Sequence, residues 1–299
     1  MKINRVMRIS VFSLLALLTV APILTAQTNQ RKKKAAPADL TKPPLIEADL
    51  SVLPKNMEQV DLFILMGQSN MKGHGVMPAE PLNSPQIINM HMVTDDWFLA
   101  RHPLHLTGDP KDFSGANNAG VGPGLAFAQK LAEAQPKTRI ALIPCAVGGS
   151  SVGQWSKGRG NYEAAVRRAK LALEMGPKGK TRLAGILWHQ GESDSTSEKK
   201  VAAYSQKLGQ MIDDLRQDLG VSDLPFIACT IGEKKNPKVR AALNAKLLNL
   251  PSLRPNTACA DGRSHASYVD AVHFDTAAQD KFGSLYAEEY LKLTQPNSN

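Results

Sequence analysis

Short apolar runs alternate with amphipathic stretches along most of the chain. Apolar runs of strand length occur at residues 60–66, 139–145, 183–188 and 224–230, with a weaker one at 257–260. Apolar residues recur at helical spacing over residues 124–135, 162–175, 198–219, 237–250 and 276–293. Alternating strands and helices predict parallel β–α–β units with helices on both faces of one sheet. We therefore expect one α/β domain built on a five-stranded parallel sheet.

Residues 71–120 interrupt this pattern. They are rich in Gly, Pro, Asn, Asp and His and show little periodicity. A long irregular insertion in a compact domain is often a binding loop, and we interpret this segment as one. Within it, His105 is a candidate for shaping a site, whereas His74 has no partner in the pattern.

Polar turns follow four of the predicted strands. They comprise residues 67–70, 148–151, 189–194 and, after the fifth strand, 270–273. In an open parallel sheet, ligands bind outside the carboxyl ends of the strands. We therefore expect these turns, although far apart in the sequence, to meet at one edge of the sheet.

The turns together contain the residues of a serine hydrolase. A serine hydroxyl is a weak nucleophile until a base takes its proton, and histidine has a suitable pKa for that role. We predict Ser69 as the nucleophile, His273 as the base and Asp270 as the group that orients the imidazole. Each motif alone is common in ordinary turns and loops. Their expected convergence is what favours catalysis.

Acyl transfer also requires hydrogen-bond donors for the developing oxyanion. The candidates are the backbone N–H of Ser69, the backbone N–H of Gly148 or Gly149, and the side-chain amide of Gln190. Glycine at this turn would let the backbone approach a substrate closely. A plain tight turn and an ordinary polar residue at a strand end are the simpler explanations of these residues.

Two further polar residues adjoin the predicted site. Asn70 follows the predicted nucleophile, and Glu192 lies two residues after Gln190. Both are candidate supporting residues. Glu192 is a candidate either for orienting its own loop or for replacing Asp270 as the partner of His273, and the sequence leaves both alternatives open.

The charge distribution argues against a nucleic-acid partner. The 299 residues carry a formal net charge of +9, of which residues 1–26 supply +3 and residues 27–44 supply +4. About +2 remains for the rest, so the predicted domain has no large basic excess. The basic residues 31–34 lie in a segment, 27–57, that we expect to be flexible.

The first 26 residues have the pattern of a secretory signal peptide. A basic start is followed by a short apolar run and small residues before Gln27. We expect cleavage near Ala26, a secreted or periplasmic protein and no stable membrane anchor. Residues 294–299 would form a C-terminal tail. The three cysteines have no zinc-type spacing, so we expect no metal site.

Four sequence blocks resemble those of the SGNH-hydrolase superfamily and, within it, the sialate O-acetylesterase and acetylxylan esterase branch, carbohydrate esterase family six. The blocks are residues 67–71, 143–150, 188–194 and 270–274, of which the third is the most specific. The resemblance extends over about residues 58–293. It implies a three-layer α/β/α flavodoxin-like fold and a serine esterase without a cofactor, acting on O-acetyl groups of sugars.

The resemblance also implies a role for each matching residue. Ser69 corresponds to the nucleophile, Asp270 and His273 to the rest of the triad, and Gly149 with Gln190 to the oxyanion hole. The chemistry of the residues leads to the same triad, but it leaves Gly148 and Gly149 as alternatives for the oxyanion hole.

Two residues depart from the family pattern. Lys72 stands where relatives usually have a small residue, so the local substrate contacts are expected to differ. Ala271 replaces a glycine that is often found between the aspartate and the histidine. Neither departure removes a catalytic group.

The sequence thus predicts an exported serine esterase that removes acetyl groups from a carbohydrate, of the acetylxylan or sialic-acid type. Two alternatives remain: a short-chain lipid or aryl esterase on the same fold, and a carbohydrate-binding protein that has lost turnover. The presence of Ser69, Asp270 and His273 argues against the second alternative. The choice of sugar and the oligomeric state are left open.

Overall fold

A mixed seven-stranded sheet runs through the part of the chain that the computed structural model describes, residues 42–79 and 84–295. The strands are β1 (Gln59–Gly67), β2 (Ile87–Met90), β3 (Trp97–Leu99), β4 (Thr138–Pro144), β5 (Thr181–His189), β6 (Phe226–Cys229) and β7 (Thr257–Ala260). Their order is β3-β2-β4-β1-β5-β6-β7, and all neighbours pair in parallel except β2 and β3.

Helices connect the strands. They are α1 (Ser69–Lys72), α2 (Gly124–Ala134), α3 (Gly160–Met175), α4 (Glu198–Leu219), α5 (Pro237–Leu248), α6 (Leu250–Leu253) and α7 (Thr276–Thr294), with 3-10 turns η1 (Val152–Trp155) and η2 (Arg263–His265). The helix predicted at 237–250 ends at Leu248 as α5, and a separate short helix, α6, begins at Leu250. Proline at the start of α6 lacks the N–H that would continue the hydrogen-bond ladder of α5.

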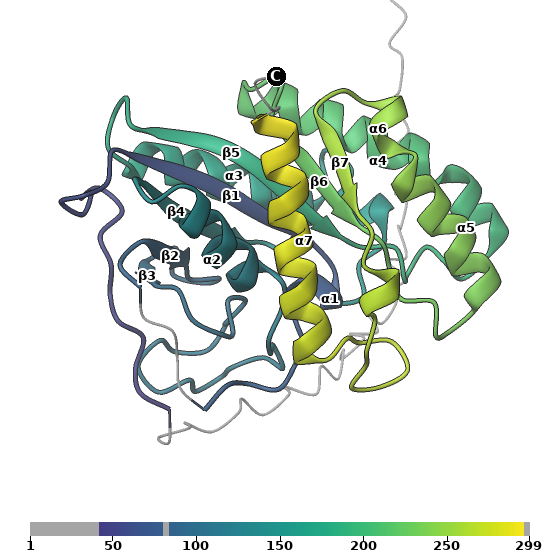
Figure 1. The fold of residues 1–299 in the computed structure, drawn as a ribbon, viewed down its shortest axis with the longest axis horizontal. Coiled ribbons are helices and arrows are strands. Elements are labelled where there is room, and N and C mark those ends of the chain that lie inside the picture. The colour runs from purple at the N-terminus through teal and green to yellow at the C-terminus, as the bar shows by residue number, and fades with distance from the viewer. Residues whose placement is uncertain (1–41, 80–83, 296–299) are drawn as a thin grey trace, which may run out of the picture. The chain divides into compact units, whose positions relative to one another are not determined.

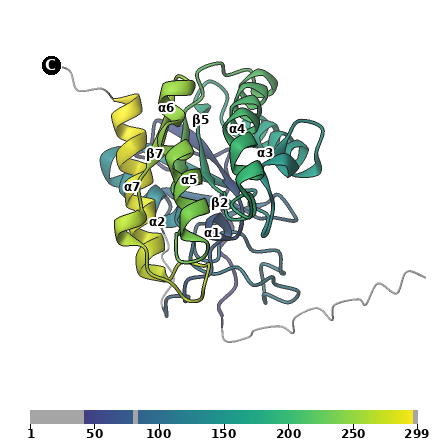
Figure 2. The same ribbon diagram turned by 90° about the vertical axis from the view of Figure 1, so that its right-hand side faces the viewer.

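The helices cover both faces of the sheet (Figure 1). Alternate residues of β1 point to opposite faces, so Leu62 and Ile64 pack with α3, α4 and α5, whereas Phe63 and Leu65 pack with α2 and α7. Figure 2 shows α2 and α7 on one side and α3 and α4 on the other, with strands between them. The predicted three-layer α/β/α class is confirmed.

The number of strands differs from the prediction. The structure has seven strands among its described residues, because β2 and β3 lie within the segment that we interpreted as an irregular loop. These strands have only four and three residues. Strands this short depend on their partners, β4 for β2 and β2 for β3, and the local pattern does not reveal such pairing.

The folded part begins earlier in the chain than predicted. Leu50 is buried in the core, and the backbone of Ala48 and Leu99 donates hydrogen bonds to Trp97 and Ile46, respectively. This part of the segment expected to be flexible therefore runs along β3. The predicted signal peptide, the basic residues 31–34 and the last four residues of the chain lie outside the described residues.

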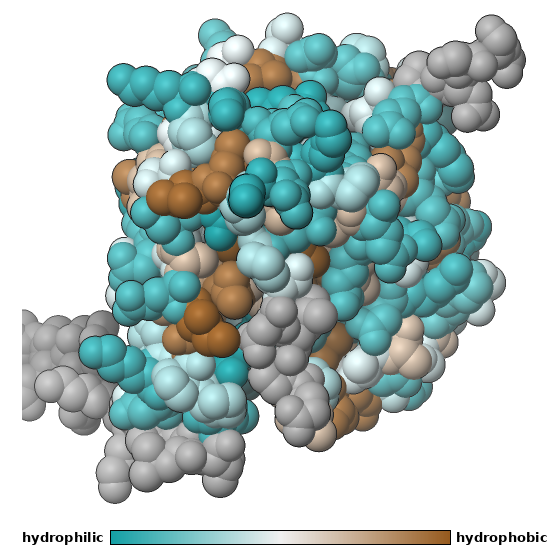
Figure 3. All heavy atoms as spheres, turned by 60° about the vertical axis from the view of Figure 1, so that its left-hand side comes forward, coloured by the Kyte–Doolittle hydropathy of each residue, from teal (hydrophilic) through white to brown (hydrophobic). Residues whose placement is uncertain are grey.

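Two negative findings apply to the described residues. None of their helices is long and apolar enough to cross a membrane. No group of three or more His, Cys, Asp or Glu side chains within residues 42–79 and 84–295 is arranged to hold a metal ion. On the face shown in Figure 3, hydrophobic side chains form several separate clusters in a mostly hydrophilic surface.

The centre of the sheet positions the first polar turn. Strand β1 is buried between β4 and β5, and it ends at Gly67, which has a φ of +130°. A Cβ at this glycine would lie 2.2 Å from the carbonyl oxygen of His189 at the end of β5. Only glycine therefore lets the chain turn here and begin α1 at Ser69.

Candidate active site

Ser69, His273 and Asp270 lie in one line of hydrogen bonds. The Ser69 Oγ atom is 3.0 Å from His273 Nε2, and His273 Nδ1 is 2.7 Å from Asp270 Oδ2. A proton on Nδ1 satisfies the carboxylate and leaves Nε2 to accept from the serine hydroxyl. The structure thus brings Ser69 to a histidine 204 positions later in the chain and to the aspartate three positions before that histidine. This is the arrangement that proton removal from a serine requires.

Asp270, rather than Glu192, is the partner of His273. Its Oδ1 atom also accepts hydrogen bonds from the backbone N–H groups of Val272 and His273, at 2.6 and 2.7 Å. These bonds, first that from the His273 backbone and then that from its ring, hold the pKa of Asp270 well below its usual value. The group therefore remains a carboxylate throughout the neutral pH range.

Asn70 fixes the loop that carries His273. Its side-chain amide donates to the carbonyl oxygen of Val272 at 3.2 Å, and its Oδ1 atom accepts from the backbone N–H of Phe274 at 3.2 Å. Asn70 therefore holds the backbone on both sides of His273. It also donates to Glu192 Oε1 at 2.5 Å, so Glu192 acts on the loop through Asn70. Burial raises the pKa of Glu192.

Two backbone donors lie open beside the serine. Within the described part of the chain, the N–H groups of Ser69 and Gly149 donate no hydrogen bond to another protein atom, and both residues line the same cavity. Ser69 begins α1, where the first N–H groups have no partner within the helix. Gly149 has a φ of +74°, a conformation that favours glycine. Gly148, beside it, also lines the cavity.

Gln190 does not take the position expected of an oxyanion donor. Its side chain is fully buried, and its Nε2 atom donates to Asp194 at 2.7 Å, to the Ser150 carbonyl at 3.0 Å and to Gln68 Oε1 at 3.1 Å. The two amide protons are therefore already used. Gln190 instead connects the turns that follow β1, β4 and β5. It therefore holds these three turns together from inside the protein.

The triad lies in the wall of an open cavity of about 660 Å³. Several elements contribute to it, including α1, the glycine turn after β4, the turn after β5 and the loop before α7. The lining residues are Gln68, Ser69, Lys72, His74, Asn118, Gly148, Gly149, Glu192, Ser193, Thr196, Lys235, Arg240, Val272 and His273. All four predicted turns thus line one cavity, because the fourth of them, residues 270–273, is the loop before α7.

The sequence pattern did not reveal the position of His74. Its ring stacks on that of His273, with centroids 3.8 Å apart and planes inclined by 16°. The flanking glycines, Gly73 and Gly75, were the available signal, because they indicate a backbone that something approaches closely. Lys72 also lines the cavity, and its Nζ atom donates to Asn118 at 2.5 Å.

His105 is buried away from this cavity. It is 1% exposed and is absent from the cavity lining. Burial lowers its pKa to about 3, so the ring stays neutral. Its backbone carbonyl accepts from Asn117, the neighbour of the lining residue Asn118. His105 therefore supports the loop and has no direct access to a substrate.

His189 is a second buried, neutral histidine. It packs among Phe274, Phe282 and Tyr286, with ring centroids 5.7, 5.9 and 6.4 Å away. Neither ring nitrogen has a hydrogen-bond partner within the described residues. Burial lowers its pKa from 6.5 to about 3.

This depressed pKa makes the fold sensitive to acid. Below pH 6.5 the unfolded chain binds a proton at His189 that the folded chain does not, so stability is lost as the pH falls towards the folded-state pKa. Between pH 7 and pH 5 this linkage costs about 2 kcal/mol of unfolding free energy. We expect His189→Leu to reduce the pH-dependent loss by that amount in urea denaturation. The exposed His265→Leu serves as control, and equal losses in both variants would contradict the expectation.

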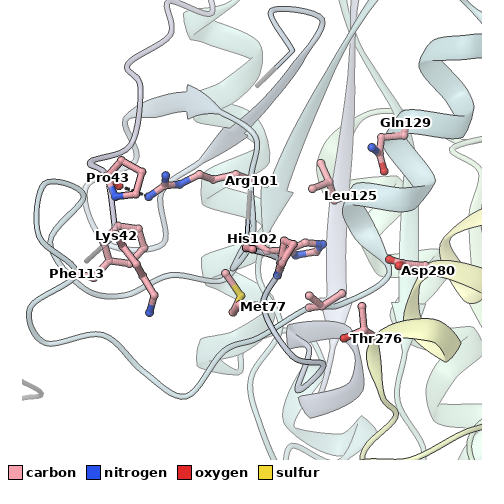
Figure 4. Close-up of a pocket in the computed structure, with 13 residues that line it drawn as sticks. Lys42, Pro43, Met77, Arg101, His102, Phe113, Leu125, Gln129, Thr276 and Asp280 are labelled. Atoms are coloured by element: carbon pink, nitrogen blue, oxygen red, sulfur yellow. Dashed lines mark hydrogen bonds between the residues drawn. The ribbon is translucent and has the colours of Figure 1, made fainter. Parts of the chain in front are cut away.

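A second cavity, of about 310 Å³, lies apart from the triad (Figure 4). It shares no lining residue with the first cavity within the described residues. Arg101 packs on the ring of Phe113, 5.0 Å from its centroid, and donates to the Pro43 carbonyl. His102, Thr276 and Asp280 form other parts of the wall.

Comparison with known proteins identifies relatives with this arrangement of elements. The family described as "Carbohydrate esterase, sialic acid-specific acetylesterase" matches residues 59–292. A probable carbohydrate esterase from Arabidopsis thaliana is 31% identical over 261 residues, which cover 81% of this chain and 92% of that protein. The X-ray structure of the same Arabidopsis protein has a TM-score of 0.68 and 28% identity, and covers 78% of this chain and 98% of that chain.

Two further solved structures share the fold. The structure of NanS has a TM-score of 0.66 with 18% identity over 81% of this chain and 99% of that chain. A carbohydrate acetylesterase from Xanthomonas citri has a TM-score of 0.56 with 18% identity over 81% of this chain and 57% of that chain. The family resemblance suggested by the four sequence blocks is confirmed. The chain belongs to the carbohydrate esterase family of the sialic acid-specific acetylesterases and is a carboxylic ester hydrolase.

Proposed function

We propose that this esterase removes O-acetyl groups from carbohydrates through an acetyl-enzyme intermediate on Ser69. The observation that carries the proposal is the line of hydrogen bonds from Ser69 through His273 to Asp270 at the wall of an open cavity. A serine with a base at 3.0 Å, which is itself oriented by a carboxylate at 2.7 Å, is equipped for acyl transfer.

The first half of the reaction forms the acetyl-enzyme. Ser69 Oγ attacks the acetyl carbonyl carbon while His273 Nε2 takes the hydroxyl proton. The carbonyl oxygen becomes an oxyanion that accepts hydrogen bonds from the N–H groups of Ser69 and Gly149. When the carbon–oxygen bond to the sugar breaks, His273 returns its proton to the departing sugar oxygen.

The second half releases acetate. Water attacks the acetyl carbon and gives a proton to His273, and the tetrahedral intermediate then collapses as Ser69 Oγ leaves and recovers that proton. Asp270 stabilises the imidazolium that forms in both halves. Every proton moves between Ser69, His273, water and the sugar, so this route needs no cofactor.

The cavity lining favours acetyl esters of polar molecules over lipid esters. Among the described residues that line it, Val272 is the only one with an aliphatic hydrocarbon side chain. A long acyl chain would gain little from such walls, because its binding depends on burying apolar surface. We therefore place carbohydrate acetylesterase activity ahead of the lipid esterase alternative. Faster hydrolysis of aryl esters of long acids than of aryl acetates would reverse this order.

The charges around the cavity favour an acidic sugar. Lys72, Lys235 and Arg240 line it against one carboxylate, Glu192. Lys72 stands where the family usually has a small residue. A carboxylate on the substrate would find complementary charge here. We therefore propose acetylated sialic acids, the substrate class in the family's description, ahead of neutral acetylated xylans.

This preference can be tested with Lys72→Met. Losing one charge-assisted contact of roughly 1.4 kcal/mol raises KM about tenfold for an acetylated acidic sugar and much less for a neutral acetylated xylooligosaccharide. Acetate release from both substrates measures the effect. Lys238→Met, at an exposed position in α5 outside the cavity, is the matched control. A similar rise in KM for both sugars would contradict the acidic preference.

We also propose that the protein is exported. The support is the signal-peptide pattern of residues 1–26. N-terminal sequencing of the mature protein would begin near Gln27 if this is correct. A mature protein that retains Met1 would contradict it.

A further inference from the structure

His74 lies flat against the catalytic candidate His273. The ring centroids are 3.8 Å apart and the planes are inclined by only 16°. His74 also lines the cavity beside Ser69. It comes from the segment after α1, whereas His273 precedes α7, so the stack joins two parts of the chain that are 199 residues apart (273 − 74).

The backbone on either side of His74 is held in place. Gly73 has a φ of +92°, and a Cβ there would lie 2.4 Å from the backbone of Val121. Gly75 exchanges hydrogen bonds with Val121 at 3.0 and 2.9 Å. These close contacts fix the peptide from which the imidazole of His74 projects.

The same segment is tied to the helix that follows His273. Thr276, the first residue of α7, donates from its hydroxyl to the carbonyl oxygen of Val76 at 2.9 Å. A Cβ on Gly75 would lie 2.8 Å from that hydroxyl, so glycine permits this approach. The two histidines are therefore carried by backbone segments that are joined beside the stack.

The hydrogen bonds of His273 leave one motion of its ring uncontrolled. Its partners, Asp270 and Ser69, lie at the two ring nitrogens. Together with the Cβ–Cγ bond, these two hydrogen bonds still allow small tilts of the ring, through coupled rotation about the Cα–Cβ and Cβ–Cγ bonds. A flat group against one face opposes that tilt, because tilting would separate or overlap the two rings.

We propose that His74 is a positioning residue that holds the imidazole of His273 in the plane connecting Asp270 to Ser69. This inference rests on the proposed function, in which His273 is the base. The stack also excludes water from one face of that ring. A flat, uncharged ring is all that the role requires.

The electrostatics of His74 agree with this role. Burial, followed by the nearby charges of His273 and Lys72, lowers its pKa to about 4, while Asp270 opposes the change. His74 is therefore neutral near pH 7. When His273 becomes an imidazolium during the reaction, a neutral aromatic face beside it attracts the charge, whereas a second cation would repel it.

The test compares His74→Phe with His74→Ala. Phenylalanine keeps a flat, neutral ring and alanine removes it. For aryl acetate hydrolysis, we expect His74→Ala to lower kcat about tenfold with KM nearly unchanged, from the loss of one aromatic pair, and His74→Phe to stay within about threefold of wild type. His265→Ala, at an exposed position outside the cavity, controls for the loss of a histidine.

A spectroscopic readout separates this inference from the proposed function. In wild type and His74→Phe, the ring ¹⁵N signals of His273 should report one dominant tautomer, with the proton on Nδ1. In His74→Ala, the two signals should move closer together, because the ring samples both tautomers. If Ser69→Ala kept full turnover, the proposed function would fail while these signals still tested the stack.

Two results would overturn the inference. One is wild-type kcat and unchanged His273 signals in His74→Ala. The other is an equal loss of kcat in His74→Ala and His74→Phe, which would mean that the ring nitrogens of His74 matter rather than its flat face. If His74→Ala folds poorly, His74→Leu fills the space without a flat ring and replaces it in the same comparison.

Discussion

Replacing Ser69 with alanine is expected to lower kcat for aryl acetate hydrolysis by about 10⁴- to 10⁶-fold. The change removes the one oxygen that forms the covalent bond to the acetyl group. The backbone N–H groups of Ser69 and Gly149 remain, so a small residual rate from the oxyanion hole is expected. Ser69 is 7% exposed and its side chain is small, so the thermal unfolding midpoint should change little.

The matched control is another serine of the same cavity. Ser193 lines the cavity, and its hydroxyl donates to the carbonyl oxygen of Gly149 at 2.9 Å. Among the described residues, the Ser193 hydroxyl donates to no histidine or carboxylate that could take its proton. We therefore expect Ser193→Ala to lower kcat less than about tenfold. A Ser69→Ala protein that keeps more than a tenth of the wild-type rate would rule out the nucleophile assignment.

The second large effect is expected for Asp270→Asn. An amide at this position has no negative charge to stabilise the imidazolium, and its NH₂ group favours the wrong tautomer of His273. We expect kcat to fall by about 10²- to 10⁴-fold with KM changed far less. The half-exposed position of Asp270, with 52% of its side chain accessible, makes the lower part of this range the expectation.

Glu192→Gln distinguishes the two carboxylates that the sequence left as alternatives. Glutamine keeps an oxygen to accept from Asn70, so the loop that carries His273 stays in place. The rate should therefore fall by much less than in Asp270→Asn. Steady-state kinetics of both variants on the same aryl acetate provide the comparison. A larger loss in Glu192→Gln would show that Glu192 is the functional partner of His273.

The fold was predictable where the apolar pattern of a segment matches its burial in the folded protein. Strand β1 is buried on both faces, so its sequence is a continuous apolar run that stands out. Strand β2 has four residues and lies between β4 and the edge strand β3. It is defined by its pairing with β4. Such a strand has no local signature strong enough to separate it from a loop.

Residue types at strand ends were enough to predict that the triad and the glycine turn meet at one site. The direction of each side chain was not predictable in the same way. Gln190 follows β5 as expected, but the positions of Ser150 and Asp194 decide that its amide points into the protein. His74 joins the site through a stack on His273, a contact that depends on the packing of the segment after α1.

Detection of an acetyl group on Ser69 tests the proposed mechanism most directly. The enzyme is mixed with an acetylated substrate, quenched in acid within one turnover, digested and analysed by mass spectrometry. If Ser69 is the nucleophile, the peptide that contains Ser69 gains the mass of one acetyl group. Acetate release with no acetylated peptide, or with the acetyl group on another residue, would contradict it.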